Sequence, residues 1–184
     1  MNEEGFFTHV CPKKYQDSEM DLLDKQSDVL KEFGKKWAVE PTSLFLWGNK
    51  GAGKTRYAFA LIREVFRRCR KVIWPRYFTS PELDSKLHQA IMDGGDRYLI
   101  ENLSKEDLLF IDDFGRETKS DRVRRQYFEI INYRYANELP TIITSNFDLD
   151  FIAEHLGDVI ASRIEETQII KFTGKDLRKK ELVV

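Results

Sequence analysis

A short glycine-rich run joins an apolar segment to an amphipathic one. Residues 48–55 read GNKGAGKT and match the pattern G-x-x-x-x-G-K-[ST] at each fixed position. Glycines allow successive backbone N–H groups to turn toward phosphate oxygens, and the positive end of the helix that follows attracts the same charge. We therefore predict a loop that binds the phosphates of ATP or ADP. Its residues are Gly48, Asn49, Lys50, Gly51, Ala52, Gly53, Lys54 and Thr55.

Three side chains in and beyond this loop form a candidate Mg²⁺ site together with the phosphates. Lys54 is expected to reach the β- and γ-phosphates, and Thr55 to offer its hydroxyl to Mg²⁺. Asp112 directly follows the apolar run 108–111. A carboxylate at the end of such a run is unfavourable unless a cation meets it. Hydrated Mg²⁺ is the cation that we expect there.

Asp113 has two interpretations. As the second of two adjacent acids at the end of a strand, it could orient or deprotonate an attacking water molecule. Alternatively, it could cap the loop that begins at Phe114 and Gly115. The first interpretation predicts hydrolysis of the bound nucleotide, and the second predicts only a structural role.

Two further polar residues each have a catalytic and a structural interpretation. Asn146 follows the apolar run 141–144, where its amide could hold the attacking water or contact the γ-phosphate, or could simply form a turn. Arg163 lies beside Glu165 and Glu166 in a predicted helix. It could form surface ion pairs of little energetic value, or it could act as an arginine finger on the ATP of a neighbouring subunit.

These residues need a parallel sheet to bring them together. Apolar runs predict strands at 43–47, 71–74, 108–111, 141–144 and 168–172. Helical spacing predicts helices at 54–70, 81–92, 96–103, 120–137, 148–156 and 158–165, and helix over much of 17–40. Strands that alternate with helices favour a parallel sheet covered on both faces. In such sheets the sites lie at the carboxyl ends of the strands, where each candidate residue falls.

Composition narrows the class of protein. The 184 residues are enough for one domain, and 30 basic residues balance 31 acidic ones, so no overall positive field attracts nucleic acid or lipid. Cys11 and Cys69 lie far apart without the spacing of a zinc site or a disulfide framework. The acidic start does not resemble a signal peptide, and the longest apolar stretch, 57–62, is too short for a membrane span. We expect a cytoplasmic location and no membrane partner.

Six motifs together resemble the DnaC/IstB branch of the AAA+ ATPases, the helicase loaders of bacteria and phages. They are GNKGAGKT at 48–55, LLFIDDFG at 108–115, IINYRY at 130–135, PTIITSN at 140–146, IASRIEE at 160–166 and FTGKDLR at 172–178. The resemblance implies a P-loop NTPase, AAA+ or RecA-like, with a three-layer sandwich and a five-stranded parallel sheet of order 5-1-4-3-2. It also implies that Asn146 is sensor 1, Arg163 the finger that acts in trans, and Arg178 a sensor 2-like arginine near the nucleotide.

The resemblance also implies a domain organisation. Residues 41–178 would form the ATPase core, residues 1–40 an amino-terminal helical or linker segment, and residues 179–184 a basic and then apolar tail. Family loaders usually carry a further amino-terminal domain that grips the replicative helicase, whereas fewer than fifty residues precede the phosphate loop here. Pro12 and Tyr15 resemble the family's linker and could flank adenine, although Tyr15 could equally be a packed core residue.

The function expected from this resemblance is ATP hydrolysis coupled to loading or remodelling a replicative helicase, with self-association through Arg163. Single-stranded DNA is a possible partner, because three basic groups could supply the cations and aromatic side chains that its binding needs. The groups are Arg63, Arg67, Arg68, Arg70 and Lys71; Arg76, Tyr77 and Phe78; and Arg122, Arg124 and Arg125. Each group could instead be a solvated helix face, and the third group could bind an acidic face of the next subunit.

Three alternatives remain open at this point. An IstB-like transposition ATPase would use the same core on a transposase, and the sequence offers little to separate it from a loader. A P-loop small-molecule kinase would need an arginine-bearing lid and an acceptor pocket, in place of the double aspartate and Asn146. An ATP-dependent adaptor would bind nucleotide and seldom hydrolyse it.

Overall fold

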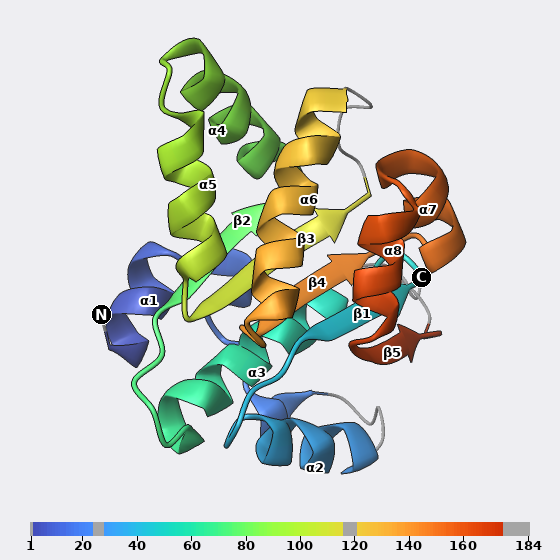
Figure 1. Ribbon diagram of the computed structural model, residues 1–184. Coiled ribbons are helices and arrows are strands. Elements are labelled where there is room, and N and C mark those ends of the chain that lie inside the picture. Colours follow the sequence, from blue (N-terminus) through green and yellow to red (C-terminus); the bar gives the residue numbers. More distant parts are fainter. Residues whose placement is uncertain (1, 24–27, 116–120, 175–184) are drawn as a thin grey trace, which may run out of the picture.

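The central feature of the computed structural model, which describes residues 2–23, 28–115 and 121–174, is one parallel β-sheet (Figure 1). Its five strands follow the order β2-β3-β4-β1-β5, with every neighbouring pair parallel. This is the predicted order 5-1-4-3-2 read from the other edge, so the fold prediction is confirmed. The strands are β1 (Leu44–Gly48), β2 (Pro75–Thr79), β3 (Leu108–Phe114), β4 (Thr141–Ser145) and β5 (Gln168–Phe172).

The inner strands are apolar because both faces of the sheet are covered. Successive side chains of a strand point to opposite faces. In β3, Leu108 and Phe110 accordingly join one apolar cluster, whereas Leu109 and Ile111 join the other. All four side chains are fully buried. The continuous apolar run in the sequence therefore supplies both cores at once.

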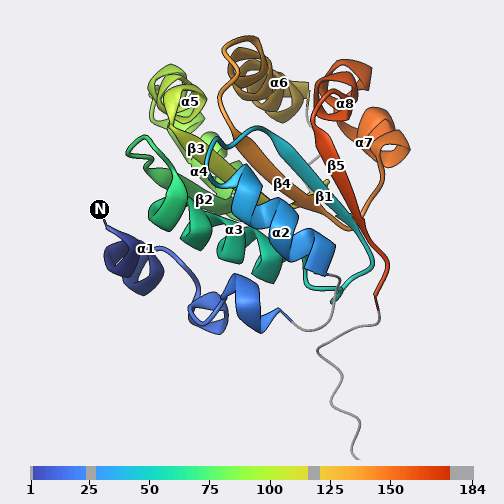
Figure 2. The same cartoon turned by 90° about the horizontal axis from the view of Figure 1, so that it is seen from below.

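Helices form a layer on each side of the sheet (Figure 2). One layer contains α1 (Glu3–His9), α2 (Asp28–Trp37) and α3 (Lys54–Arg68), with short 3-10 turns at Lys13–Tyr15 and Met20–Leu22. The opposite layer contains α4 (Ser80–Met92), α5 (Asp96–Lys105), α6 (Asp121–Ala136), α7 (Leu149–Leu156) and α8 (Asp158–Glu165). The arrangement is the expected three-layer sandwich. None of the described helices is long and apolar enough to cross a membrane.

The second strand lies four residues later than predicted. The sequence analysis placed it at 71–74, whereas β2 spans Pro75–Thr79. Val72 is 78% exposed and therefore contributes little to the core. Tyr77 instead packs against Phe59 and Phe110. Proline is tolerated at the first position of an edge strand, because its missing N–H breaks no ladder bond there. β2 can therefore begin at Pro75.

The amino-terminal region also differs from its prediction. Instead of one helix that begins near residue 17, the structure has α1, two 3-10 turns and then α2. Asn2 caps α1 by accepting a hydrogen bond from the backbone N–H of Gly5 at 2.9 Å. Phe6, Phe7 and Met20 from this region are buried in the same apolar cluster as α3. The segment therefore packs directly on the helix that follows the phosphate loop.

Candidate functional site

The phosphate loop has the conformation that its glycines permit. Gly51 and Gly53 adopt left-handed φ angles of 80° and 98°. At Gly48, a Cβ atom would lie 2.1 Å from the carbonyl oxygen of Phe172, so the close approach of β5 requires glycine there. Gly53 occupies the N-cap of α3 and has no side chain with which to cap it. The first turn of α3 is therefore a suitable place for an anion.

Lys54 connects the loop to the end of β4. Its ammonium group donates to the carbonyl oxygens of Gly48 and Asn49, each at 2.9 Å, and to Oδ1 of Asn146 at 3.0 Å. The residue is only 5% exposed. An ammonium group in this position could donate to the phosphates that the loop is expected to bind.

The predicted Mg²⁺ ligands lie side by side. The hydroxyl of Thr55 donates to Oδ1 of Asp112 at 2.8 Å, and the hydroxyl of Thr144 donates to the same oxygen. Burial raises the pKa of Asp112, and the two hydroxyl donors oppose that rise because they favour the charged form. A bound cation would oppose it further. A buried carboxylate beside a threonine hydroxyl therefore fits Mg²⁺, a hard cation that keeps several waters and binds through one or two protein oxygens and phosphate.

The same part of the site argues against a metal held by protein alone. Within residues 2–23, 28–115 and 121–174, no group of three or more His, Cys, Asp or Glu residues lies close enough to hold an ion. A magnesium ion at Asp112 would accordingly depend on the phosphates of the nucleotide for its remaining ligands.

Asp113 lies beside Asn146. Its backbone has a left-handed φ of 60°, which is uncommon for a residue other than glycine. The side-chain amide of Asn146 donates to Oδ1 of Asp113 at 3.1 Å while its own oxygen accepts from Lys54. A continuous chain of hydrogen bonds therefore runs from Lys54 to the second acid, Asp113.

Arg163 does not join this cluster. Its guanidinium lies 4.4 Å above the centroid of the Tyr135 ring and 3.7 Å from a carboxylate oxygen of Glu166. The Tyr135 hydroxyl in turn donates to Glu166. Among the described residues, these contacts of Arg163 lie with Tyr135 and Glu166, and neither reaches Lys54 or the two acids. Arg178, the predicted sensor 2-like residue, lies outside the described residues.

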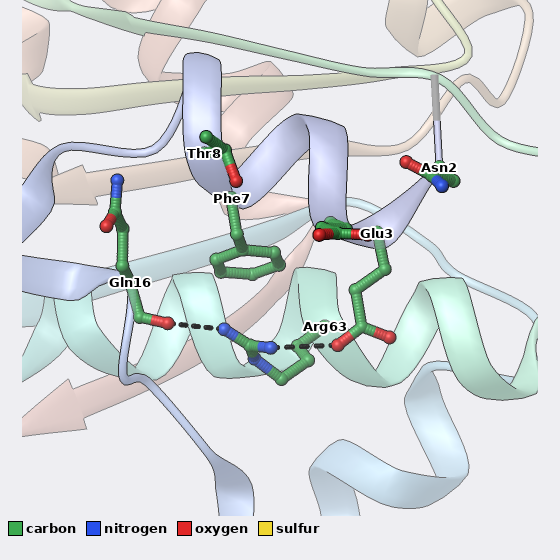
Figure 3. Close-up of a pocket in the computed structure, with 7 residues that line it drawn as sticks. Asn2, Glu3, Phe7, Thr8, Gln16 and Arg63 are labelled. Carbon is green, nitrogen blue, oxygen red and sulfur yellow. Dashed lines mark hydrogen bonds and ion pairs between the residues drawn. The ribbon is translucent and has the colours of Figure 1, made fainter.

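Several arginines of α3 bind the chain's own amino-terminal segment. Figure 3 shows Arg63 between Glu3, whose carboxylate it contacts at 2.8 Å, and the carbonyl oxygen of Gln16, at 2.5 Å. Arg63 also stacks on Phe7, with its guanidinium carbon 3.8 Å from the ring centroid. Arg67 contacts Glu3 and Glu19. These cations have intramolecular partners, which disfavours the predicted role of this group in binding DNA.

The other two basic groups also have contacts within the chain. Tyr77 and Phe78 pack into the two apolar clusters, so the second group offers little for base stacking. The group on α6 borders a cavity of about 610 Å³ between α5 and α6, where Arg122 pairs with Asp96 at 3.3 Å. Arginines and acids together line this cavity, namely Arg97, Arg122, Arg125, Asp96 and Glu129. Tyr15 stacks on Phe59, which favours its interpretation as a packed core residue.

Sequence analysis missed one residue of the site, Thr144. Its hydroxyl contacts both acids, since it donates to Asp112 and accepts from the backbone N–H of Asp113 at 3.1 Å. The only signal in the sequence is its position two residues before Asn146 in a strand that ends at the site. That signal becomes readable only when the register of β4 against β3 is known.

Comparisons with known proteins agree with this geometry. Residues 13–181 match the family described as IstB-like ATP binding protein. An insertion sequence ATP-binding protein of Sinorhizobium fredii is 30% identical over 158 residues, which cover 83% of this chain and 63% of that protein. The replicative helicase loader DnaC of Escherichia coli is 25% identical over 150 residues, which cover 80% of this chain and 58% of the loader.

A solved structure supports the same assignment. The crystal structure of the DnaC helicase loader superimposes with a TM-score of 0.75 at 25% identity, and the match covers 89% of this chain and all of that one. The chain spans less than two thirds of the length of the two curated relatives. Because the family match covers most of the chain and the fold is that of the AAA+ ATPases, this protein belongs to the IstB-like ATP-binding family.

Proposed function

We propose that this protein binds and hydrolyses Mg-ATP. The observation that carries the proposal is the chain of hydrogen bonds from Lys54 through Asn146 to Asp113, beside the contact between Thr55 and Asp112. These groups unite a phosphate-binding cation, a metal-binding pair and a candidate base within one cluster. An adaptor that only binds nucleotide would have no need for Asp113 to be held in a left-handed conformation against Asn146.

Each residue has one task in the proposed reaction. The loop amides and Lys54 bind the β- and γ-phosphates, and Thr55 with Asp112 would hold Mg²⁺, which neutralises charge on the phosphate oxygens when it is bound. Asp113 orients the attacking water and accepts its proton, and Asn146 fixes the position of that carboxylate. Arg163 of a neighbouring subunit would complete the charge compensation.

The proposed work of the ATPase is to load or remodel a replicative DNA helicase. The similarity to the DnaC loader in sequence and fold supports this role. A transposition ATPase is the second candidate, because the insertion sequence protein of Sinorhizobium fredii is at least as similar. Affinity capture with ATP present tests both roles, since a helicase would support the first and a transposase the second.

Nucleotide binding by the wild type and a Lys54→Ala variant tests the ATP site. Removing the ammonium group leaves the phosphates without their main cation, so we expect the affinity for ATP to fall at least about 100-fold while the fold is retained. Calorimetric titration measures the affinity, and circular dichroism checks the fold. Equal affinity in the two proteins would contradict the assignment. Single-turnover hydrolysis with and without single-stranded DNA then separates an ATPase from an adaptor.

A further inference from the structure

The two acids of the site lie in a β-bulge. The register between β3 and β4 pairs Ile111 with Ile143 and then Phe114 with Ser145. Asp112 and Asp113 therefore face a single residue, Thr144, on the opposite strand. A bulge of this kind inserts one extra residue, bends the strand and redirects its side chains, and bulges are common beside active sites.

The side chain of Thr144 supplies the contacts that an ordinary ladder would have provided. Its hydroxyl accepts from the backbone N–H of Asp113 at 3.1 Å and donates its own proton to Oδ1 of Asp112. Thr144 is 1% exposed, so few other donors or acceptors could replace it. Its one hydroxyl group thus binds the backbone of one acid and the carboxylate of the other.

The two contacts fix different properties of the acids. Donation to Asp112 turns its carboxylate toward Thr55, which shares the same oxygen. The hydrogen bond that Thr144 accepts from the backbone N–H of Asp113 holds Asp113 at its left-handed φ of 60°. In this conformation the carboxylate of Asp113 contacts Asn146 and not Thr55, which is the partner of Asp112. Two adjacent carboxylates are thereby directed to two separate tasks.

We propose that Thr144 is a positioning residue that, through the bulge, assigns Asp112 to the metal and Asp113 to the attacking water. The proposal rests on the proposed function, because it presupposes Mg-ATP in the site. Valine has the shape of threonine without the hydroxyl, so Thr144→Val removes both contacts with little change in volume. Thr144→Ser keeps the hydroxyl and should restore them.

Ser145 provides a matched control on the same strand. Its buried hydroxyl donates to the carbonyl oxygen of Phe114 in β3 at 2.7 Å and accepts from the backbone N–H of Phe147 at 3.0 Å, but it contacts neither acid. Ser145→Ala should therefore lower the melting temperature without altering the chemistry of the site. Thr144→Ala is the second variant if the valine variant does not fold, since it places no additional methyl group near Asp112.

The experiment measures the affinity for a fluorescent ATP analogue with Mg²⁺ and with EDTA, and then kcat and KM for hydrolysis. For Thr144→Val we expect equal affinity in EDTA, a gain from Mg²⁺ reduced about tenfold, a kcat at least about 100-fold lower and a KM within about threefold of the wild type. Thr144→Ser and Ser145→Ala should both keep the gain from Mg²⁺ and most of the kcat.

The results separate the two proposals. A wild type that gains nothing from Mg²⁺ and hydrolyses nothing would overturn both. A wild type that does both, with a Thr144→Val variant that matches it, would overturn only the role of Thr144. Equal losses in Thr144→Ser, or in Ser145→Ala, would also overturn it, because they would show that strand packing and not this hydroxyl controls the site.

Discussion

At the scale of single residues, Asn146 connects Lys54 of the phosphate loop to the second acid, Asp113. Its oxygen accepts from Lys54 at 3.0 Å and its amide donates to Asp113 at 3.1 Å. An amide side chain can present an acceptor to the lysine and a donor to the acid at the same time. The sequence places Asn146 at the end of a strand, but this double contact depends on the rotamer and on the neighbouring strand.

The role of Asp113 is tested by Asp113→Asn, which keeps the size of the side chain and removes the basic carboxylate. We expect ATP binding within about threefold of the wild type and single-turnover hydrolysis slower by about 10² to 10⁴, the usual contribution of a general base. Equilibrium titration and rapid-quench kinetics measure the two quantities. Hydrolysis within tenfold of the wild type would instead support the interpretation of Asp113 as a loop cap.

At the scale of elements, sequence reasoning succeeds where one pattern determines the structure. The prediction of β5 at 168–172 matches the structure at both ends, because a short apolar segment between polar turns has few other interpretations. The apolar run 108–111 correctly predicts the start of β3, but the strand continues to Phe114 and so includes both acids. Two features were not predictable in this way. The position of β2 depends on which residues pair with β3, and the bulge at Asp112 and Asp113 depends on strand register. Both arise from contacts between segments far apart in the chain.

The basic face of α3 shows the same limit. Its arginines indicate either solvent or DNA, whereas the structure pairs Arg63 and Arg67 with acids and carbonyl groups of residues 3–19. A count of charges along one helix does not reveal a partner located some 60 positions earlier, at Glu3. The consequence is that α1 and the turns that follow it are held on the helix that carries Lys54 and Thr55.

Cys11 can report on this attachment. This residue of the amino-terminal segment is 4% exposed, and burial raises the pKa of its thiol to about 12. Since the thiolate is the reactive form, we expect slow labelling at pH 8 and a rate that still increases above pH 10, where an exposed thiol has reached its plateau. Alkylation of a Cys69→Ser protein, followed by mass spectrometry, measures the rate of this thiol alone.

Within that background, Arg63→Met should accelerate the labelling of Cys11 about tenfold, because it removes the contacts with Glu3 and Gln16 and favours local opening. Arg68→Met is the matched control, since Arg68 pairs with Glu64 inside α3 and not with the amino-terminal segment. Equal rates in the two variants would show that Arg63 does not hold this segment in place.

At the scale of the whole molecule, the position of Arg163 suggests a division of the site between subunits. In the single chain its guanidinium is held by Tyr135 and Glu166, remote from the hydrogen-bond chain of the phosphate loop. Its Nε is buried and has no hydrogen-bond partner. The Arg163 side chain is 31% exposed and its contacts do not reach the phosphate loop of its own chain, so it fits an action on a neighbouring molecule better than one on its own nucleotide.

A mixing experiment tests this division. Arg163→Ala and Lys54→Ala should each be inactive alone, the first for want of a finger and the second for want of a nucleotide site. If the finger acts in trans, mixtures should recover activity, because an intact site of one variant meets an intact finger of the other. ATPase assays at several protein concentrations measure the recovery. A mixture no more active than its components, beside a wild type of constant specific activity, would contradict the model.

The packing of residues 2–22 on α3 has a practical consequence for handling the protein. Phe6, Phe7 and Met20 cover apolar residues of α3 that would otherwise meet water. Removing these residues would expose an apolar surface on α3 next to the phosphate loop, and the arginines of α3 would lose their acidic partners. Such a fragment would tend to aggregate and to bind polyanions, so DNA binding observed for it would reflect the truncation and not the native surface.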